Sequence, residues 1–368
     1  MSWKDSLAKN ITTADDIAKR VSLSDEEQEK IRQYTEKYPM SVPEYYFNLI
    51  NWDDPDDPIR KIAIPRTDAF KQDGVLDTSG ESSNTVLQGV QHKYRATVLV
   101  LTSPACAMVC RHCFRKRFVG KEDTEIAQNP AEVAGYLKEH PEVNNVLLSG
   151  GDSFILDNEK IKGWLDAMTQ VDTLDFIRMG TRVPVSFPER INSDPELLEI
   201  LKKAGEKKQI YIVTQFDHPR ELTEEAGKSV KLLQEQGIVV KNQTVLLKGI
   251  NDDPAVMGDL LRKMSSVGIV QHYIFQCRPV VGAMNYFQVP LTQGIKIIDE
   301  VYKNQNGLGK AADYAMSHPT GKIKILGELD GKTVFQYKQA KNPENTGKVF
   351  MLDSDDERCW IGPDEIKL

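Results

Sequence analysis

The stretch TVLVLTSPACAMVCRHCFRKRF occupies residues 97–118 and joins an apolar run to three closely spaced cysteines. The β-branched residues at 97–103 predict a buried strand. The cysteines follow with the spacing Cys106-x3-Cys110-x2-Cys113. Three of the five cysteines thus lie within eight residues, which in a reducing compartment indicates metal ligation and not a disulfide framework.

This trio of cysteines is one ligand short of a closed iron–sulfur cube, because a [4Fe–4S] cluster has four ligands. A coordination position left open is typical of a metal centre that acts on a substrate. We therefore interpret the three cysteines as ligands of a [4Fe–4S] cluster. Zinc and redox-active cysteines are the alternatives, and His112 could be a fourth zinc ligand, but the sequence has no second zinc knuckle. Cys277 and Cys359 stand alone and are predicted to be buried apolar thiols.

Beyond residue 94 the chain repeats one pattern, a β-branched apolar run followed by a loop and a stretch with helical periodicity. The pattern predicts six strands, at residues 97–103, 145–151, 176–182, 209–215, 238–247 and 272–277. Strands that alternate with helices favour a parallel α/β sheet, which we predict to be a partial (β/α)6 TIM-type barrel. A doubly wound sheet is the alternative. In both, the site lies at the carboxyl ends of the strands, where polar residues follow: the cysteines, Gly150, Gly151, Asp152, Arg182, Gln215 and Arg278.

The flanks of the barrel differ in composition from the barrel itself. Residues 1–90 are predicted to form an N-terminal helical and irregular region, with Ser24 as a helix cap and a polar loop at 77–85. The barrel is predicted over residues 91–321. Residues 322–368 are predicted to form a small C-terminal β extension, because a DG turn separates two segments of alternating character.

The bulk composition narrows the class of protein. The 368 residues carry a net charge of −7, with 40% hydrophobic and 27% charged residues, which is typical of a globular protein. This balance disfavours a nucleic-acid partner, since phosphate contacts need a basic surface. The first residues lack the apolar core of a secretory signal, and the apolar runs are too short to cross a bilayer. We therefore expect a cytoplasmic protein with no nucleic-acid partner and no membrane anchor.

The cysteine loop resembles that of the radical S-adenosylmethionine (SAM) superfamily, and the motifs around it narrow the resemblance. Over roughly residues 90–325 the chain resembles the lysine 2,3-aminomutase family. The motifs that carry this resemblance are CRHCFRKRF (110–118), LLSGGD (147–152), RMGTRVPVSFPERI (178–191), TQFDHP (214–219), NQTVLLKGIND (242–252), YIFQC (273–277) and SHPTGK (317–322). The resemblance implies three cofactors, namely a [4Fe–4S] cluster, SAM and pyridoxal 5′-phosphate (PLP), and an external one-electron reductant.

The resemblance assigns a set of residues to SAM, namely Gly150, Gly151, Asp152, His112, Arg182 and Gln215. The two glycines allow close backbone approach to the methionine part, and Asp152 can accept from its ammonium group. A structural strand-to-helix turn is the alternative for this GGD segment. His112 is expected either to pack near the adenine or to shield the cluster.

For PLP, the resemblance implies that Lys322 forms the resting Schiff base, because it ends the segment SHPTGK. A solvated lysine at the start of a strand is the alternative. Lys93 matches an arginine that binds the PLP phosphate in the family. A second such arginine falls on Thr97, so Arg95 is a candidate substitute.

Three residues are predicted to meet the substrate. Arg115 matches the arginine that holds the α-carboxylate, and a surface arginine in the basic run RKR is the alternative. Arg278 and Ser317 stand where lysine enzymes of the family carry two aspartates for the distal ammonium of lysine. An arginine repels that ammonium and favours a distal carboxylate, so glutamate is the expected substrate, unless Arg278 pairs with an internal acid.

The sequence therefore predicts a radical SAM, PLP-dependent 2,3-aminomutase that converts an α-amino acid into a β-amino acid. An enzyme that acts on a lysine within a protein is one alternative, and a radical deaminase or dehydratase with the same cofactors is another. A non-catalytic iron–sulfur scaffold is a third. The resemblance also implies a homodimer or a higher homo-oligomer.

Overall fold

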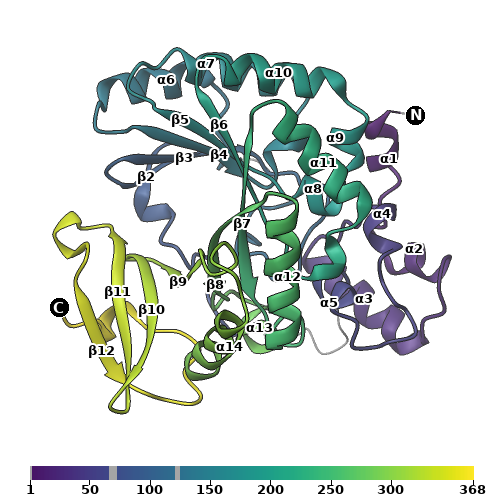
Figure 1. The fold of residues 1–368 in the computed structure, drawn as a ribbon. Coiled ribbons are helices and arrows are strands. Elements are labelled where there is room, and N and C mark those ends of the chain that lie inside the picture. Colours follow the sequence, from purple (N-terminus) through teal and green to yellow (C-terminus); the bar gives the residue numbers. More distant parts are fainter. Residues whose placement is uncertain (1, 66–72, 121–124) are drawn as a thin grey trace.

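The computed structural model describes residues 2–65, 73–120 and 125–368, and one curved sheet dominates this part of the chain (Figure 1). Its twelve strands are arranged in chain order, so that each strand pairs with the next. Helices cover the outer side of the sheet. Most of the buried apolar side chains belong to one continuous core that reaches from the N-terminal helices to the last strands.

The central strands form the predicted partial barrel, because every adjacent pair from β3 to β8 is parallel. These six strands are β3 (Thr97–Ser103), β4 (Asn145–Gly150), β5 (Phe176–Gly180), β6 (Gln209–Thr214), β7 (Val239–Leu246) and β8 (Val270–Gln276). The structure adds a seventh parallel strand, β9 (Asp313–His318), beside β8. The sequence did not reveal β9, because its short segment mixes polar and apolar residues without a clear period.

Three of the helices between the strands begin with the same signal. Asn129, Asp194 and Asp253 each cap a helix whose first residue is proline, and each side chain accepts from a backbone amide of the first turn. The long outer helices are α6 (Pro130–Glu139), α7 (Asn158–Thr169), α10 (Pro195–Gly205), α11 (Glu224–Glu235), α12 (Pro254–Ser266) and α14 (Leu291–Lys303). Short helices α8 (Val183–Ser186), α9 (Glu189–Asn192) and α13 (Met284–Phe287) follow β5 and β8.

The N-terminal region is rich in helices. Ser24 caps its longest helix, and its side chain and that of Glu27 bond each other's backbone amides. The helices are α1 (Trp3–Leu7), α2 (Ala14–Ala18), α3 (Asp25–Lys37), α4 (Glu44–Phe47) and α5 (Pro58–Ala63). Two strands then lead into the barrel, namely β1 (Thr85–Leu87) and β2 (Val90–Tyr94), and β2 pairs antiparallel with β3.

The C-terminal strands continue the same sheet. A tight turn at Asp330 and Gly331, both with positive φ, joins β10 (Gly321–Leu329) to β11 (Lys332–Ala340), and β12 (Val349–Asp353) follows. β10 pairs with β9, so the sheet runs without a break across residues 321 and 322. Lys93 on β2 reaches the end of β9, where its Nζ donates to the carbonyl of His318 over 2.5 Å. This bond joins the two sides of the open barrel.

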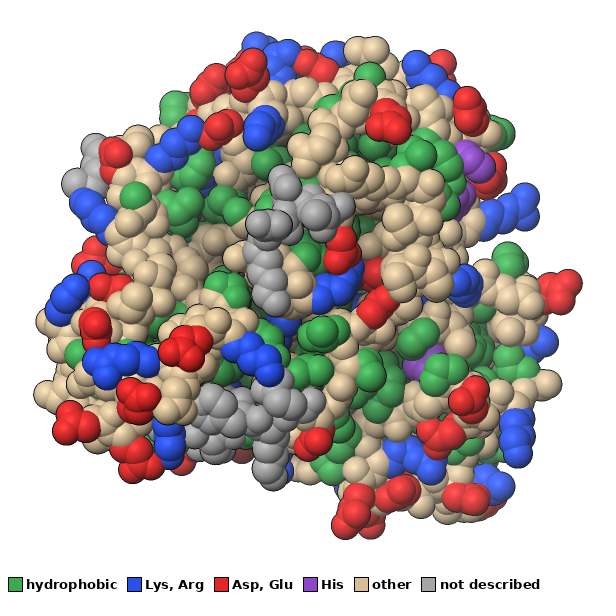
Figure 2. All heavy atoms as spheres, turned by 180° about the vertical axis from the view of Figure 1, so that it is seen from behind, with side chains coloured by type: hydrophobic (Ala, Val, Ile, Leu, Met, Phe, Trp, Pro, Cys, Tyr) green, Lys and Arg blue, Asp and Glu red, His purple; other side chains and the backbone are tan. Residues whose placement is uncertain are grey.

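Acidic and basic side chains are interspersed on the face of the molecule that Figure 2 shows. Among the described helices, none combines the length and the apolar character that crossing a bilayer requires.

Candidate active site

The cysteine loop leaves β3 and packs against the glycines that end β4. The amide of Gly151 donates to the carbonyl of Ser103 (2.6 Å), and the amide of Asp152 donates to the carbonyl of Ala105 (2.8 Å). A Cβ on Gly150 would lie 2.4 Å from the carbonyl oxygen of Ser103, and one on Gly151 would lie 2.3 Å from that of Ala105. Gly150 also has a φ of +124°, which L side chains rarely adopt. The close approach of the two loops therefore requires both glycines.

The thiols of Cys106, Cys110 and Cys113 are partly buried and form no disulfide. The chain places no fourth cysteine beside them, so one iron of a [4Fe–4S] cluster would be left without a cysteine ligand.

A buried ion network reaches the cysteine loop through Arg182. Its Nη1 donates to Sγ of Cys110 over 3.2 Å, and its Nε donates to the carbonyl of Gln215 over 3.0 Å. Its Nη2 lies 2.5 Å from the carboxylate of Glu221 and 3.5 Å from that of Asp217. Burial opposes the charge on Arg182, but the thiol and the two carboxylates outweigh it and raise the pKa well above its usual value. Arg182 therefore stays protonated beside Cys110, one of the predicted cluster ligands.

His112 and Gln215 contact each other in the site. Nε2 of Gln215 lies 2.8 Å from Nε2 of His112 and donates to it, and it also donates to Asp217. Burial lowers the pKa of His112 well below its usual value, so the imidazole is neutral. Its Nδ1 is buried without a hydrogen-bond partner among the described residues. A buried polar atom without a partner is costly, and a bound cofactor can supply one.

Asp152 is already engaged within the protein. Its Oδ1 accepts from the amide of Phe154 (2.9 Å), and its Oδ2 accepts from the amide of Arg182 (2.7 Å). Burial raises the pKa of this carboxyl, although the amides act in the opposite direction. These bonds join the loop after β4 to the loop after β5, as the structural interpretation of the GGD turn requires. A contact with the SAM ammonium stays a prediction.

Lys322 is the second residue of β10 and lies directly opposite Ser317 of β9. Its Nζ lies 4.6 Å from the ring centre of Tyr273 and 4.5 Å from that of Phe275. Burial lowers the pKa of Lys322 to about 7, and Arg278 makes the largest cationic contribution. The amine is therefore partly uncharged and nucleophilic near neutral pH, which suits attack on a carbonyl such as that of PLP. This environment does not fit a solvated surface lysine.

Lys93 belongs to the same group of cations as Lys322. Besides His318, its Nζ donates to the carbonyl of Ser79 over 3.4 Å, and burial lowers its pKa to about 7. Arg95 lies exposed in the turn between β2 and β3. Its guanidinium forms no hydrogen bond or ion pair with the described residues. The structure thus brings Lys93 to Lys322 and leaves Arg95 outside the group.

Arg115 is buried, with 8% of its surface exposed, so the surface alternative is wrong. Its Nε and Nη2 each lie 3.3 Å from Oε1 of Glu81, which also pairs with Arg117 at 2.5 Å. Its Nη1 donates to the hydroxyl of Ser149 (3.1 Å) and to the carbonyl of Gly150 (3.0 Å). Four of its five N–H donors are therefore in use, and one on Nη2 is left for a ligand.

Arg278 and Arg115 both place their guanidinium groups over the ring of Phe114. The guanidinium carbons of Arg278 and Arg115 lie 3.9 Å and 4.8 Å from the ring centre of Phe114. Arg278 also donates to the hydroxyl of Ser79. Burial lowers its pKa to about 10, which leaves it charged at neutral pH. The acid that most affects it, Glu81, is instead paired with other arginines.

Several residues of the site were missed by sequence reasoning. The polar loop at 77–85 was interpreted only as a connection, yet Ser79 and Glu81 within it contact the arginines. The aromatic cradle of Lys322 and the acids beside Arg182 were also missed. The alternation of Tyr273 and Phe275 on one face of a strand was a usable signal for the cradle.

The two remaining cysteines differ from each other. Cys277 is buried, as predicted. Cys359 is only partly buried, so the prediction of a buried thiol is wrong there. Its sulfur donates to the carbonyl of Glu357 over 3.4 Å, within the turn that follows β12.

Comparison with known proteins agrees with this geometry. Residues 100–260 match the model of the radical SAM superfamily. L-lysine 2,3-aminomutase of Acetoanaerobium sticklandii is 35% identical over 311 residues, covering 83% of this chain and 73% of that protein. A relative in Aquifex aeolicus, provisionally named for the same activity, is 40% identical over 92% of this chain and 91% of its own length. Glutamate 2,3-aminomutase of Clostridioides difficile is 30% identical over 87% of this chain and 75% of its own length.

The chain belongs to the lysine 2,3-aminomutase family. It is an isomerase that uses a [4Fe–4S] cluster, SAM and PLP together with a reductant and a small-molecule substrate. The described residues fit these groups: three free thiols on one loop suit a cluster with an open iron, the paired glycines leave room beside Cys106, and Lys322 has a nucleophilic amine. A solved structure described as native anSMEcpe with bound AdoMet aligns with a TM-score of 0.43 and 11% identity, over 56% of this chain and 58% of that one.

Proposed function

We propose that this enzyme is a 2,3-aminomutase for an α-amino acid with a distal carboxylate, and that glutamate is its preferred substrate. The observation that carries the proposal is the position of Arg278, which is a partly buried cation. The acid that most affects it, Glu81, forms its ion pairs with Arg115 and Arg117. Burying a charge without a partner is unfavourable, and a substrate carboxylate would offset that cost.

The charge of the pocket supports the same substrate. Lys93, Lys322 and Arg278 act on one another as like charges, and each has a lowered pKa. A lysine substrate would bring a further ammonium into this group, and like charges in a poorly solvated site repel by several kcal/mol. A dicarboxylic amino acid brings anions instead.

The length of the arginine side chain also favours glutamate over longer substrates. In the lysine enzymes the corresponding position is an aspartate, according to the resemblance described above. Arginine extends several bonds further than aspartate and stands over the ring of Phe114. It therefore occupies space that the end of a lysine substrate would need. Glutamate has a shorter side chain and ends in the group that a guanidinium binds best.

Each residue has a defined role in this proposal. When bound, the cluster with SAM would supply radical chemistry, and PLP would supply a carbonyl for the amino group of the substrate. Cys106, Cys110 and Cys113 hold the irons. Lys322 binds PLP covalently through its amine, and Lys93 meets the phosphate. Arg115 offers its remaining Nη2 donor to the α-carboxylate, with Glu81 orienting the guanidinium.

The test is a panel of substrates. The protein is reconstituted with iron and sulfide without oxygen and loaded with PLP. It is then incubated with SAM, dithionite and one of glutamate, aspartate, glutamine, lysine or a lysine-containing peptide. Mass spectrometry should detect β-glutamate. Turnover of lysine with no turnover of glutamate would overturn the proposal. Modification of the peptide would indicate a protein substrate. Release of ammonia would indicate an elimination and not a migration of the amino group.

A further inference from the structure

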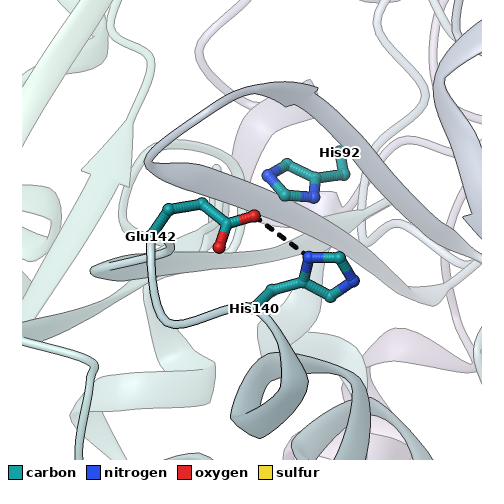
Figure 3. A group of neighbouring side chains, drawn as sticks. All are labelled: His92, His140 and Glu142. Atoms are coloured by element: carbon teal, nitrogen blue, oxygen red, sulfur yellow. Dashed lines mark hydrogen bonds and ion pairs between the residues drawn. The ribbon is translucent and has the colours of Figure 1, made fainter.

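A second group of metal-ligating side chains lies away from the cysteine loop, where His92, His140 and Glu142 converge (Figure 3). His92 is on β2, His140 caps α6, and Glu142 lies in the turn before β4. The ligand atoms that the three residues offer all lie within 4.8 Å of one another. We propose that these side chains bind a divalent transition-metal ion at a site separate from the iron–sulfur cluster, and that the preferred ion is Zn²⁺.

The donor set suits zinc. Two imidazoles and one carboxylate leave a fourth position for water in a tetrahedral site. Nδ1 of His140 lies 3.0 Å from Oε1 of Glu142. Two ligands on a tetrahedral zinc with bonds of about 2.1 Å stand roughly 3.4 Å apart. This pair therefore needs almost no movement to share one ion, and only His92 has to approach further.

Hydrogen bonds hold His92 in the tautomer that a metal needs. Its Nε2 lies 3.1 Å from the carbonyl of Arg95, which can only accept, so Nε2 carries the proton and Nδ1 has the lone pair. Metal-ligating histidines commonly use this second bond to a carbonyl. Nδ1 lies 2.8 Å from the hydroxyl of Tyr136, which can turn to bond a metal-bound water instead. The Tyr136 ring also packs on His140, with ring centres 4.1 Å apart.

The site would connect two parts of the fold. The ion would tie β2 to the turn between α6 and β4. His92 precedes Lys93, and the alternation of side chains along a strand points them to opposite faces. An ion at His92 would therefore stabilise the strand that carries Lys93. The side chains of His140 and Glu142 are 36% and 33% exposed, so an ion can enter from solvent.

The test uses the holoprotein, so that iron already occupies the cysteines. After dialysis against a chelator, Zn²⁺ is titrated in competition with a chromophoric indicator, and iron is measured before and after. We expect one Zn²⁺ per chain. His92→Ala and Glu142→Gln should each weaken binding at least tenfold, whereas Glu139→Gln, an exposed acid near the end of α6, should bind like the wild type. Zn²⁺ should also raise the thermal midpoint of the wild type but not of Glu142→Gln.

X-ray absorption at the zinc edge separates this site from the cysteines. A shell of nitrogen and oxygen neighbours without sulfur supports the proposal. Sulfur neighbours, or loss of iron during the titration, would show zinc at the cysteine loop and overturn it. Equal binding by the wild type and the His92→Ala variant would overturn it as well, and would leave an ordinary hydrogen bond between His140 and Glu142.

Discussion

Arg182 donates a hydrogen bond from Nη1 to the sulfur of Cys110 over 3.2 Å. The same guanidinium pairs with Glu221 behind it, so the cation is held in place beside the predicted cluster ligand. Hydrogen bonds and positive charge near a ligating sulfur stabilise the reduced, more negative cluster. The contact therefore predicts that Arg182 raises the reduction potential of the cluster.

Replacing Arg182 by methionine should lower that potential, on the order of 90 mV for a loss of about 2 kcal/mol in stabilisation of the reduced form of this one-electron couple. Redox titration followed by electron paramagnetic resonance measures the shift. Because the change also leaves Glu221 and Asp217 buried without their cation, Arg182→Lys serves as a second variant that keeps the charge. An unchanged potential in Arg182→Met with full iron content would contradict the prediction.

Arg278 should decide which amino acid is turned over. Arg278→Asp is expected to lower kcat/KM for glutamate at least about thirtyfold, since truncating one partner of a buried charge pair costs about 2–5 kcal/mol. Steady-state assays with glutamate measure the change. Arg262→Gln is a suitable control, because that arginine is 71% exposed on α12 and pairs only with Asp259 among the described residues. Full glutamate turnover by Arg278→Asp would remove the basis of the substrate proposal.

Formation of the imine between Lys322 and PLP should depend on pH. The pKa of Lys322 is lowered to about 7, so the neutral amine is scarce below pH 6 and predominates above pH 8. The initial rate of PLP incorporation into protein freed of PLP should rise about tenfold per pH unit below pH 7 and then level off. Stopped-flow absorbance at the imine band follows it.

Two variants control this experiment. Lys322→Ala should lose the imine band and keep its cluster absorbance, and Lys324→Ala should keep both. Lys324 lies two residues further along β10 and pairs with Asp313. A pH-independent rate would contradict the lowered pKa.

Glu81 should stabilise the fold through Arg115 and Arg117. Burial opposes its ionisation, but the two arginines outweigh burial and lower its pKa. A carboxylate with a lowered pKa stabilises the folded state above its ordinary pKa of about 4.5, and this contribution is lost as the pH falls through the folded value. Glu81→Gln should therefore lower the free energy of unfolding at pH 7 by about 3 kcal/mol.

Denaturant unfolding under anaerobic conditions measures this loss. Glu125→Gln is the matched control, because Glu125 pairs with the same Arg117 at 2.6 Å but is 42% exposed. An exposed ion pair contributes less than about 1 kcal/mol. Equal losses in the two variants would be evidence against a special role for Glu81.

Gly151 should be required for cluster assembly. A Cβ there would lie 2.3 Å from the carbonyl oxygen of Ala105 and 3.0 Å from Sγ of Cys106. Gly151→Ala is therefore expected to bind less than half of the wild-type iron after reconstitution. Gly163→Ala on α7 meets no atom within 4 Å and should bind the normal amount. Iron analysis and the visible spectrum decide between the two outcomes.

The sequence by itself determined six of the seven parallel strands and the cysteine loop, because both depend on local patterns. A period of two or of about 3.6 residues records which face of an element is buried, and Asn or Asp before proline marks where helices begin. Cys106, Cys110 and Cys113 are close in space because they are close in the chain. The position of Lys322 opposite Ser317 also follows from a local hairpin.

Only the tertiary structure decided which distant side chains share the site. Glu81 and Arg115 are 34 residues apart, Arg182 and Cys110 are 72 apart, and Arg278 and Ser79 are 199 apart. No local period records such contacts, because they arise when loops from different strands meet at one end of a curved sheet. The exposure of Arg95 and the lowered pKa of Lys322 likewise depend on which groups surround them, and burial is a property of the assembled fold.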